Sequence, residues 1–244
     1  MENDFFFPPY VGKKYADADN FFNDKKVLVI GNSHYCYDGY DIPKSNDKQY
    51  GTGCWSSCEN YMKDKCPNKN GDKQFTWTED AISETMGLEN FAQAIDKKLT
   101  SYLKFAIIMD ESFRSQNNLN NNERYLTFWK SIVFYNFLQA AVPSNNLQGT
   151  PKEIEKSKEI FKSLFPYLEA KYSLPDVIIV WGKENVFNHF LEFPNFELLE
   201  SRLGKFRYAG KEIDVICIYH PSARKSYEEQ RDIIKGFAPE LFPY

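Results

Sequence analysis

The sequence predicts an α/β fold, a three-layer α/β/α sandwich around a central, mainly parallel sheet of four strands. Short, continuous apolar runs are typical of strands buried on both faces of a sheet, and residues 26–30 and 177–181 are such runs. Segments with helical periodicity separate these runs, and strands that alternate with helices favour a parallel sheet. The chain has 244 residues, 42% hydrophobic and 26% charged, which suits one soluble domain with its own core.

The first third of the chain holds one strand and a long loop. Residues 1–24 are aromatic and irregular, and the prolines at positions 8 and 9 stop any helix there. Residues 26–30 form the first strand, which ends at Gly31. Residues 32–75 show no periodicity, and a loop of this length in a compact domain is usually functional or locally tied down.

The middle of the chain predicts helices and a second strand. Apolar positions recur with helical spacing over residues 88–99, and residues 124–131 also look helical. Residues 105–109 fit either a short strand or a buried helical turn, and the sequence leaves both open. Residues 132–138 are β-branched and aromatic, which favours a strand.

The last part of the chain predicts two more strands and two helices. Thr150, Pro151 and Glu153 make a capping box at the start of a helix that runs to about residue 172. Residues 177–181 are the third strand, residues 206–208 and 213–219 form a strand, a turn and the last strand, and residues 224–237 form an amphipathic helix. No internal repeat or long linker divides the chain, so we expect residues 1–244 to be a single domain.

Polar residues follow each predicted strand of the parallel sheet. They are Gly31 to Cys36, Asn136, Trp181-Gly182-Lys183 and His220 to Arg224. Ligands of such sheets bind beyond the carboxyl ends of the strands, so we expect these residues to share one site. An Asn amide suits the edge of a nucleobase, a His can donate to an oxygen that gains charge, and Ser222 can bond a phosphate oxygen.

At these residues the chain resembles the uracil-DNA glycosylase superfamily, over roughly residues 25–235. The loop Gly31-Asn32-Ser33-His34-Tyr35-Cys36 is similar, at Gly31 and Tyr35, to the family's water-activating Gly-Gln-Asp-Pro-Tyr-His. Asn136 in an apolar strand, Trp181-Gly182-Lys183 after another, and the His220-Pro221-Ser222 loop also match in family order. Arg224 resembles the arginine that follows this loop in the single-strand-selective branch.

The resemblance implies hydrolysis of the N-glycosidic bond of uracil or another damaged base in DNA, with the base flipped from the stack. It implies that His220 stabilises negative charge on the leaving base, that Asn136 selects the base, and that Tyr35 excludes larger bases. A loop aromatic usually stacks on the base in this family, and Tyr50 and Trp55 both qualify. Pro221 would stiffen the base-gripping loop, and Arg224 and Lys225 would contact phosphates.

The water-activating loop departs from the family at two positions. Ser33 replaces the Asp of the best-known members, and Asn32 stands where another branch has Glu. An amide can position water but cannot take its proton, whereas His34 adds an ionisable group that could act on water or a phosphate. Two classes of function therefore stay open: a DNA glycosylase, and a catalytically weak or inactive module that binds nucleic acid or a nucleotide. A third class, a small-molecule hydrolase, lacks a Gly-x-Ser-x-Gly elbow.

Purely structural roles compete with these assignments. Asn136 could be a buried amide satisfied by backbone, and His220 could be a plain turn residue. Trp181 fits core packing, and Asp110-Glu111 fits an exposed helix start better than a site carboxylate.

The cysteines give little support to a cofactor, and we expect neither a cofactor nor a metal. Cys36, Cys54, Cys58 and Cys66 lack the Cys-x-x-Cys spacing of zinc sites, so reduced thiols are the expectation. One glycosylase branch holds an iron–sulfur cluster, but its close cysteine pair precedes the first strand, where this chain has none. Cys217 lies in an apolar run and should be buried.

Charge and hydropathy bound the partners. A net charge of −4 argues against a broadly basic nucleic-acid coat but leaves room for a local basic patch. The acidic start of the chain is unlike a signal peptide, and no apolar run reaches the length of a membrane span. We therefore expect a cytoplasmic monomer that binds DNA, single- or double-stranded, and no membrane.

Overall fold

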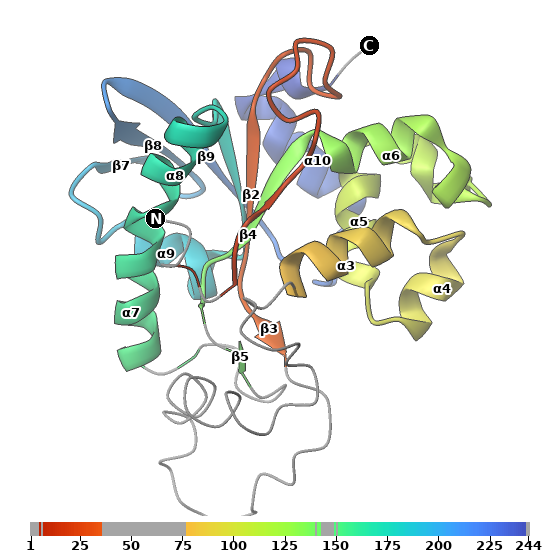
Figure 1. The fold of residues 1–244 in the computed structure, drawn as a ribbon, viewed down its shortest axis with the longest axis horizontal. Coiled ribbons are helices and arrows are strands. Elements are labelled where there is room, and N and C mark those ends of the chain that lie inside the picture. Colours follow the sequence, from red (N-terminus) through yellow and green to blue (C-terminus); the bar gives the residue numbers. More distant parts are fainter. Residues whose placement is uncertain are drawn as a thin grey trace, which may run out of the picture.

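A mixed sheet lies between two layers of helices in the computed structural model of the chain (Figure 1). The structure describes residue 5 and residues 7–35, 77–139, 141–142, 149 and 151–242. Within these residues the main sheet has seven strands in the order β1-β4-β2-β6-β9-β8-β7. The strands are β1 (Tyr10–Val11), β2 (Val27–Gly31), β4 (Ile132–Asn136), β6 (Val177–Trp181), β7 (Phe196–Glu200), β8 (Leu203–Tyr208) and β9 (Lys211–Ile218). A separate pair, β3 (His34–Tyr35) and β5 (Ala141–Val142), is parallel.

The α/β class is confirmed, but the expected sheet of four strands is wrong. The four predicted strands do pair in parallel, in the order β4-β2-β6-β9. β1 adds an antiparallel edge beside β4, from the segment that we expected to be irregular. Beyond β9 the sheet continues through antiparallel β8 and β7. β8 begins before the predicted strand at 206–208, and β7 was not predicted because most of its side chains are exposed.

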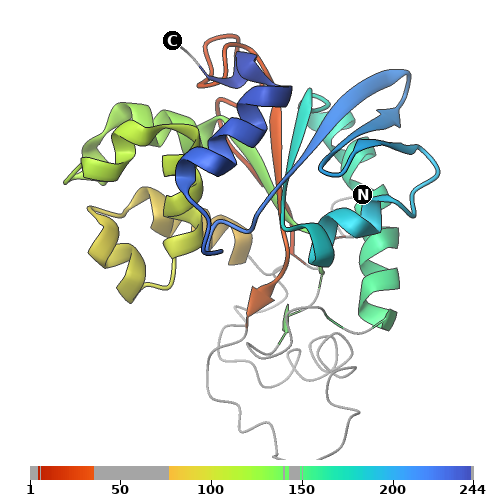
Figure 2. The ribbon, with the colours of Figure 1, turned by 180° about the vertical axis from the view of Figure 1, so that it is seen from behind.

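Each face of the sheet packs on its own aromatic core. Side chains alternate along β4, so Ile132 and Phe134 join one core while Val133 and Tyr135 join the other. The first core, which we call the α5 face, is covered by α3 (Trp77–Met86), α4 (Phe91–Asp96), α5 (Thr100–Met109), α6 (Glu123–Lys130) and α10 (Tyr227–Phe237). The second, the α7 face, is covered by α7 (Pro151–Lys162), α8 (Leu164–Lys171) and α9 (Asn188–Phe190). In the view from behind, α10 of the first face lies toward the viewer (Figure 2).

One open alternative is decided, and two predicted helices differ from the observed ones. Residues 105–109 are the buried end of α5, so the helical alternative is the correct one. The periodic stretch 88–99 is helical only over α4, and the chain turns at Lys98, which has a φ of 59°. Ile95, expected on the apolar stripe, is 57% exposed. The expected single helix to residue 172 divides at Ser163, since Pro166 has no N–H for the carbonyl four residues earlier.

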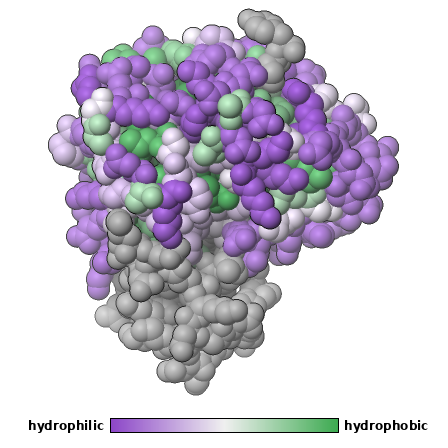
Figure 3. Space-filling view, turned by 45° about the horizontal axis from the view of Figure 1, so that its top comes forward, coloured by the Kyte–Doolittle hydropathy of each residue, from purple (hydrophilic) through white to green (hydrophobic). Residues whose placement is uncertain are grey.

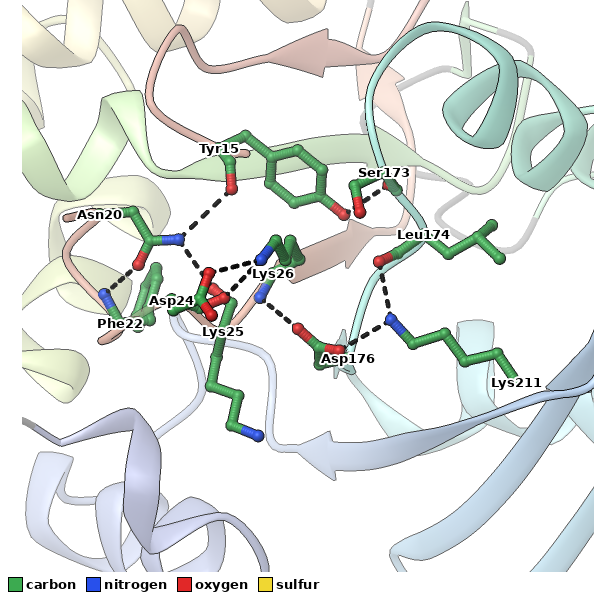
Figure 4. Close-up of polar contacts among 10 residues, drawn as sticks. All are labelled: Tyr15, Asn20, Phe22, Asp24, Lys25, Lys26, Ser173, Leu174, Asp176 and Lys211. Carbon is green, nitrogen blue, oxygen red and sulfur yellow. Dashed lines mark hydrogen bonds and ion pairs between the residues drawn. The ribbon is translucent and has the colours of Figure 1, made fainter. Parts of the chain in front are cut away.

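Polar side chains tie the amino ends of the strands together (Figure 4). The Asp176 carboxylate, just before β6, accepts the backbone N–H of Lys26 at 2.8 Å and the ammonium of Lys211 at 2.7 Å. Tyr15 donates to the Ser173 carbonyl at 3.2 Å, and the Asn20 amide bonds the carbonyl of Lys25 at 3.1 Å. These contacts join the segments before β2, β6 and β9 at one end of the sheet.

We expect Asp176→Ala to lower the free energy of unfolding by about 1–3 kcal/mol, because the partly buried Lys26 N–H loses its acceptor. Partial burial alone would raise the pKa of Asp176, but the donors Lys211 and Lys26 lower it below 3.8. The stabilisation is therefore complete above about pH 4 and is lost as the pH falls through the lowered pKa. Urea unfolding measures this effect. Asp19→Ala, at an exposed pair 3.8 Å from Lys14, is the control and should change stability by less than about 0.5 kcal/mol.

The surface that Figure 3 shows is mainly hydrophilic over the described residues, with only scattered hydrophobic areas. In the same residues, no helix combines the length and the apolar character that a membrane span needs.

Candidate functional site

The carboxyl ends of β2 and β4 place Gly31, Asn32 and Asn136 side by side. Gly31 pairs with Asn136 in the parallel register. The pairing continues past both strands, because the Gly31 carbonyl accepts the N–H of Phe137 at 3.0 Å and the Asn32 carbonyl accepts that of Leu138 at 2.8 Å. Asn32 is 7% exposed and Asn136 is 2% exposed, so both amides are held inside the protein.

Gly31 is needed because the Asn136 side chain occupies the space where its Cβ would lie. A Cβ built on Gly31 would come within 2.6 Å of Asn136 Oδ1 and 2.9 Å of Phe134 Cζ. Both distances are far below van der Waals contact. The close backbone approach that Gly31 permits is therefore, in the first place, an approach to the Asn136 side chain.

The rest of the predicted water-activating loop is described only in part. The Ser33 hydroxyl is buried and has no hydrogen-bond partner among the described residues. His34 and Tyr35 lie in β3, beside Ala141 and Val142 of β5. Only the backbone of these two loop residues is described, so their roles stay predictions. Cys36, Tyr50 and Trp55 lie outside the described residues.

His220 follows β9 and packs on the last residue of β6. Its ring meets the Trp181 ring edge to face, with 5.9 Å between centroids. Its Nδ1 lies 2.6 Å from Ser222 Oγ, and the Ser222 backbone N–H donates to the same nitrogen at 3.3 Å. The Ala223 N–H closes the turn on the His220 carbonyl at 2.7 Å. The imidazole is therefore fixed by its own loop.

These contacts determine which nitrogen of His220 carries the proton. Partial burial, helped by the nearby Lys104 ammonium, lowers the pKa of His220 to about 4, so the ring is neutral at pH 7. A backbone N–H that donates to Nδ1 requires a lone pair there. The single proton of the neutral ring then lies on Nε2, which is the donor that His220 can offer to a ligand.

We expect the pKa of His220, measured by NMR, to be about 4 and to rise toward 6.5 in Lys104→Met. Because the folded pKa is lowered, the His220 contribution to the free energy of unfolding is unchanged above about pH 6.5 and falls between about pH 6.5 and 4. Exposed Lys97→Met, at the C-cap of α4, is the charge-matched control and should leave the titration unchanged. A wild-type pKa near 6.5 would contradict the tautomer argument.

Asn136 and His220 lie on the same face of the sheet. Asn136 follows Ile132 and Phe134 along the α5 face of β4. The Trp181 ring contacts both Phe134 of β4 and His220 after β9. Its centroid lies 5.0 Å from that of the Phe134 ring and 5.9 Å from that of the His220 ring. Trp181 is also a core residue, as expected, at 3% exposure. Asn136 and His220 thus share one face of the sheet, and a common site and its binding roles stay predictions.

The remainder of the His220 loop is only partly exposed. Pro221 is buried, whereas Ser222 and Arg224 are exposed. Arg224 meets no carboxylate within the part of the chain that the structure describes.

Asp110 caps the short helix Glu111–Ser115 by accepting the Ser112 N–H at 3.0 Å, so its helix-start interpretation is confirmed.

The described cysteine does not suit an iron–sulfur cluster. Cys217 is buried in the α7 core, as predicted, and burial raises the pKa of its thiol to about 12. A cluster needs several thiolates together, and the described residues contain no group of three His, Cys, Asp or Glu placed to hold a metal. Cys36, Cys54, Cys58 and Cys66 fall outside the described residues.

Two cations near this edge were missed by the sequence argument. Lys104 of α5 acts electrostatically on His220. Arg202 lies in the turn between β7 and β8 and contacts Tyr219 at the end of β9. Neither residue follows a predicted parallel strand. No local signal in the sequence marks them, because their positions depend on how a helix and a hairpin pack back on the sheet.

Comparison with known proteins gives one informative similarity. No family model matches the chain. The chain is similar to a type-4 uracil-DNA glycosylase of Archaeoglobus fulgidus, with 36% identity over an alignment of 117 residues. The alignment covers 42% of this chain, and the chain spans only 56% of that relative. This partial similarity is to a member of the same superfamily that the strand-end motifs resemble.

Proposed function

We propose that this chain belongs to the uracil-DNA glycosylase superfamily and hydrolyses the N-glycosidic bond of uracil or another damaged base in DNA. The observation that carries the proposal is the neutral His220, held through Nδ1 by Ser222 on the same sheet face as Asn136. The partial similarity to a type-4 uracil-DNA glycosylase supports the same class of reaction. DNA is the implied partner, and the fold implied is that of the superfamily.

The proposed reaction is a displacement at the sugar. The bond between C1′ and the base nitrogen breaks, the electron pair leaves with the base, and a water oxygen bonds to C1′ while its proton passes to solvent or to the base. Negative charge grows on the base oxygen, and the Nε2–H of His220 donates to it. Asn136 would select the base by its donor and acceptor pattern.

The water-activating step is the weak part of this site. Asn32 and Ser33 can accept or donate a hydrogen bond but cannot take the proton of water. General-base catalysis typically contributes about 10²–10⁴-fold, so we expect a low rate or an unusual base. This departure favours the second candidate, a weak or inactive module on the same fold that binds nucleic acid or a nucleotide.

A strand-cleavage assay distinguishes the two candidates. Oligonucleotides carrying uracil or one of several damaged bases, single- and double-stranded, are incubated with the protein and then cleaved with alkali at abasic sites. Excision that His220→Ala slows by about 10²–10³-fold supports a glycosylase. Binding without excision supports the module, and the absence of both contradicts the proposal.

We expect Ser33→Asp to raise the excision rate by about tenfold, because it places a carboxylate at the loop position that activates water in the family's best-known members. Ser33→Asn introduces a side chain of the same shape as aspartate that cannot take a proton. It is the matched control and should give no gain. A gain with both variants would show that an effect other than proton transfer is responsible.

A further inference from the structure

The arginines divide into two groups by their partners. The sequence has six arginines, and all lie in the described residues. Four of them pair with carboxylates: Arg114, Arg124, Arg207 and Arg231. The other two, Arg202 and Arg224, meet no carboxylate within the described residues, and both lie next to the His220 loop. In a chain with a net charge of −4, this placement needs an explanation.

The unpredicted β7–β8 hairpin brings Arg202 to the carboxyl edge of the parallel sheet. β8 runs antiparallel to β9, with Leu203 opposite Ile216, so the turn before β8 lies at the end of β9. The Arg202 carbonyl accepts the N–H of Cys217 at 2.8 Å, and its Nη1 donates to the Cys217 carbonyl at 3.4 Å. The guanidinium is thus anchored just before His220.

The Tyr219 ring makes a second contact with the Arg202 guanidinium. Arg202 Cζ lies 3.8 Å from the centroid of the Tyr219 ring, and Lys225 Nζ lies 4.7 Å from it. A guanidinium stacked on an aromatic ring keeps the N–H groups at its edge available, and these match two phosphate oxygens. Lys225 is partly neutralised by Glu229, 3.0 Å away, so Arg202 carries most of the available charge.

We propose that Arg202, stacked on Tyr219 and flanked by Lys225, binds a phosphate of the DNA strand as it leaves the His220 site. This inference rests on the proposed function and adds to it the path of the strand, which crosses the start of β8. Tyr219 is a positioning residue here, because its ring orients the guanidinium and touches no phosphate.

The test is DNA binding by fluorescence anisotropy, with a labelled single-stranded oligonucleotide at several KCl concentrations. We expect Arg202→Gln to weaken binding several-fold at low salt and to reduce the slope of log K against log salt by about 0.7. Arg202→Lys should keep the slope and lose part of the affinity. Arg207→Gln, in the same hairpin but paired with Glu197 and Glu212, is the matched control and should change binding less than twofold.

Three further variants separate the cluster from a general charge effect. Tyr219→Leu should weaken binding although no charge changes, whereas Tyr219→Phe should not. Glu229→Gln should strengthen binding, because it frees Lys225. Thermal melting of each variant shows whether it is folded, and inorganic phosphate as competitor shows whether the site also takes the free ion.

The outcomes separate this inference from the proposed function. If wild-type protein binds and excises while Arg202→Gln binds equally well, the inference is wrong and the glycosylase remains. If wild-type protein binds without excising and Arg202→Gln still lowers the salt slope, the phosphate site stands and the glycosylase fails. An equal loss in Arg207→Gln would overturn the assignment to Arg202.

Discussion

We expect His220→Ala to lower the rate of base excision by about 10²–10³-fold, as removal of one donor to a developing anion typically does. The neutral ring offers a single N–H, on Nε2, and alanine leaves the leaving base without it. Asn32→Ala should cost less, because an amide there can only position water. Single-turnover cleavage of the best oligonucleotide measures both effects.

The control for this prediction is Ser222→Ala, which removes the hydroxyl beside Nδ1 but keeps the backbone N–H that fixes the tautomer. It should lower the rate far less than His220→Ala, and binding should survive in all three variants. A larger loss in Asn32→Ala than in His220→Ala would place the main barrier at water activation. Uracil excision by the wild type at the rate of a dedicated enzyme would overturn the argument from Ser33.

The second large effect concerns stability: we expect Trp181→Ala to lower the free energy of unfolding by about 3–5 kcal/mol. The indole packs against Phe134, Phe105 and Tyr102, with centroids 5.0, 5.1 and 5.7 Å away. Its removal leaves a large cavity in the α5 core and exposes one side of the His220 ring. Urea unfolding measures the loss.

The pKa of His220 distinguishes this variant from ordinary core damage. Trp181→Ala should raise it toward 6.5, because water reaches the ring, whereas Phe105→Ala should destabilise the core without moving it. If Trp181→Ala does not fold, Trp181→Phe gives the same comparison at lower cost in stability. An unchanged His220 pKa in a folded Trp181→Ala would show that the indole does not shield the imidazole.

The parallel strands could be predicted because both of their faces are buried. A strand such as β2 or β6 then has apolar residues at every position and a polar residue or glycine where it leaves the core. The same logic predicted the proximity of Gly31 and Asn136, since carboxyl ends of parallel strands meet at one edge.

The edges of the sheet could not be predicted in this way. β7 exposes Leu198 and Leu199 at 48% and 46%, and its one strand neighbour in the described sheet is β8. Its apolar residues therefore do not show the pattern of a buried strand. β1 has two residues, too few to show any period. The unpredicted hairpin places Arg202 beside the candidate site. Its proposed phosphate contact could therefore not be inferred from the sequence.

The polar ties drawn in Figure 4 have a consequence for how this chain can change. Asp176 and Lys211 connect the strands at their amino ends, whereas Asn136 ends β4 and His220 follows β9 at the carboxyl ends. These polar ties and the candidate site residues thus lie at opposite ends of the same sheet. We expect exposed residues of the candidate site, such as Ser222 and Arg224, to be exchangeable with little cost to folding, so the specificity of this scaffold should be open to directed evolution.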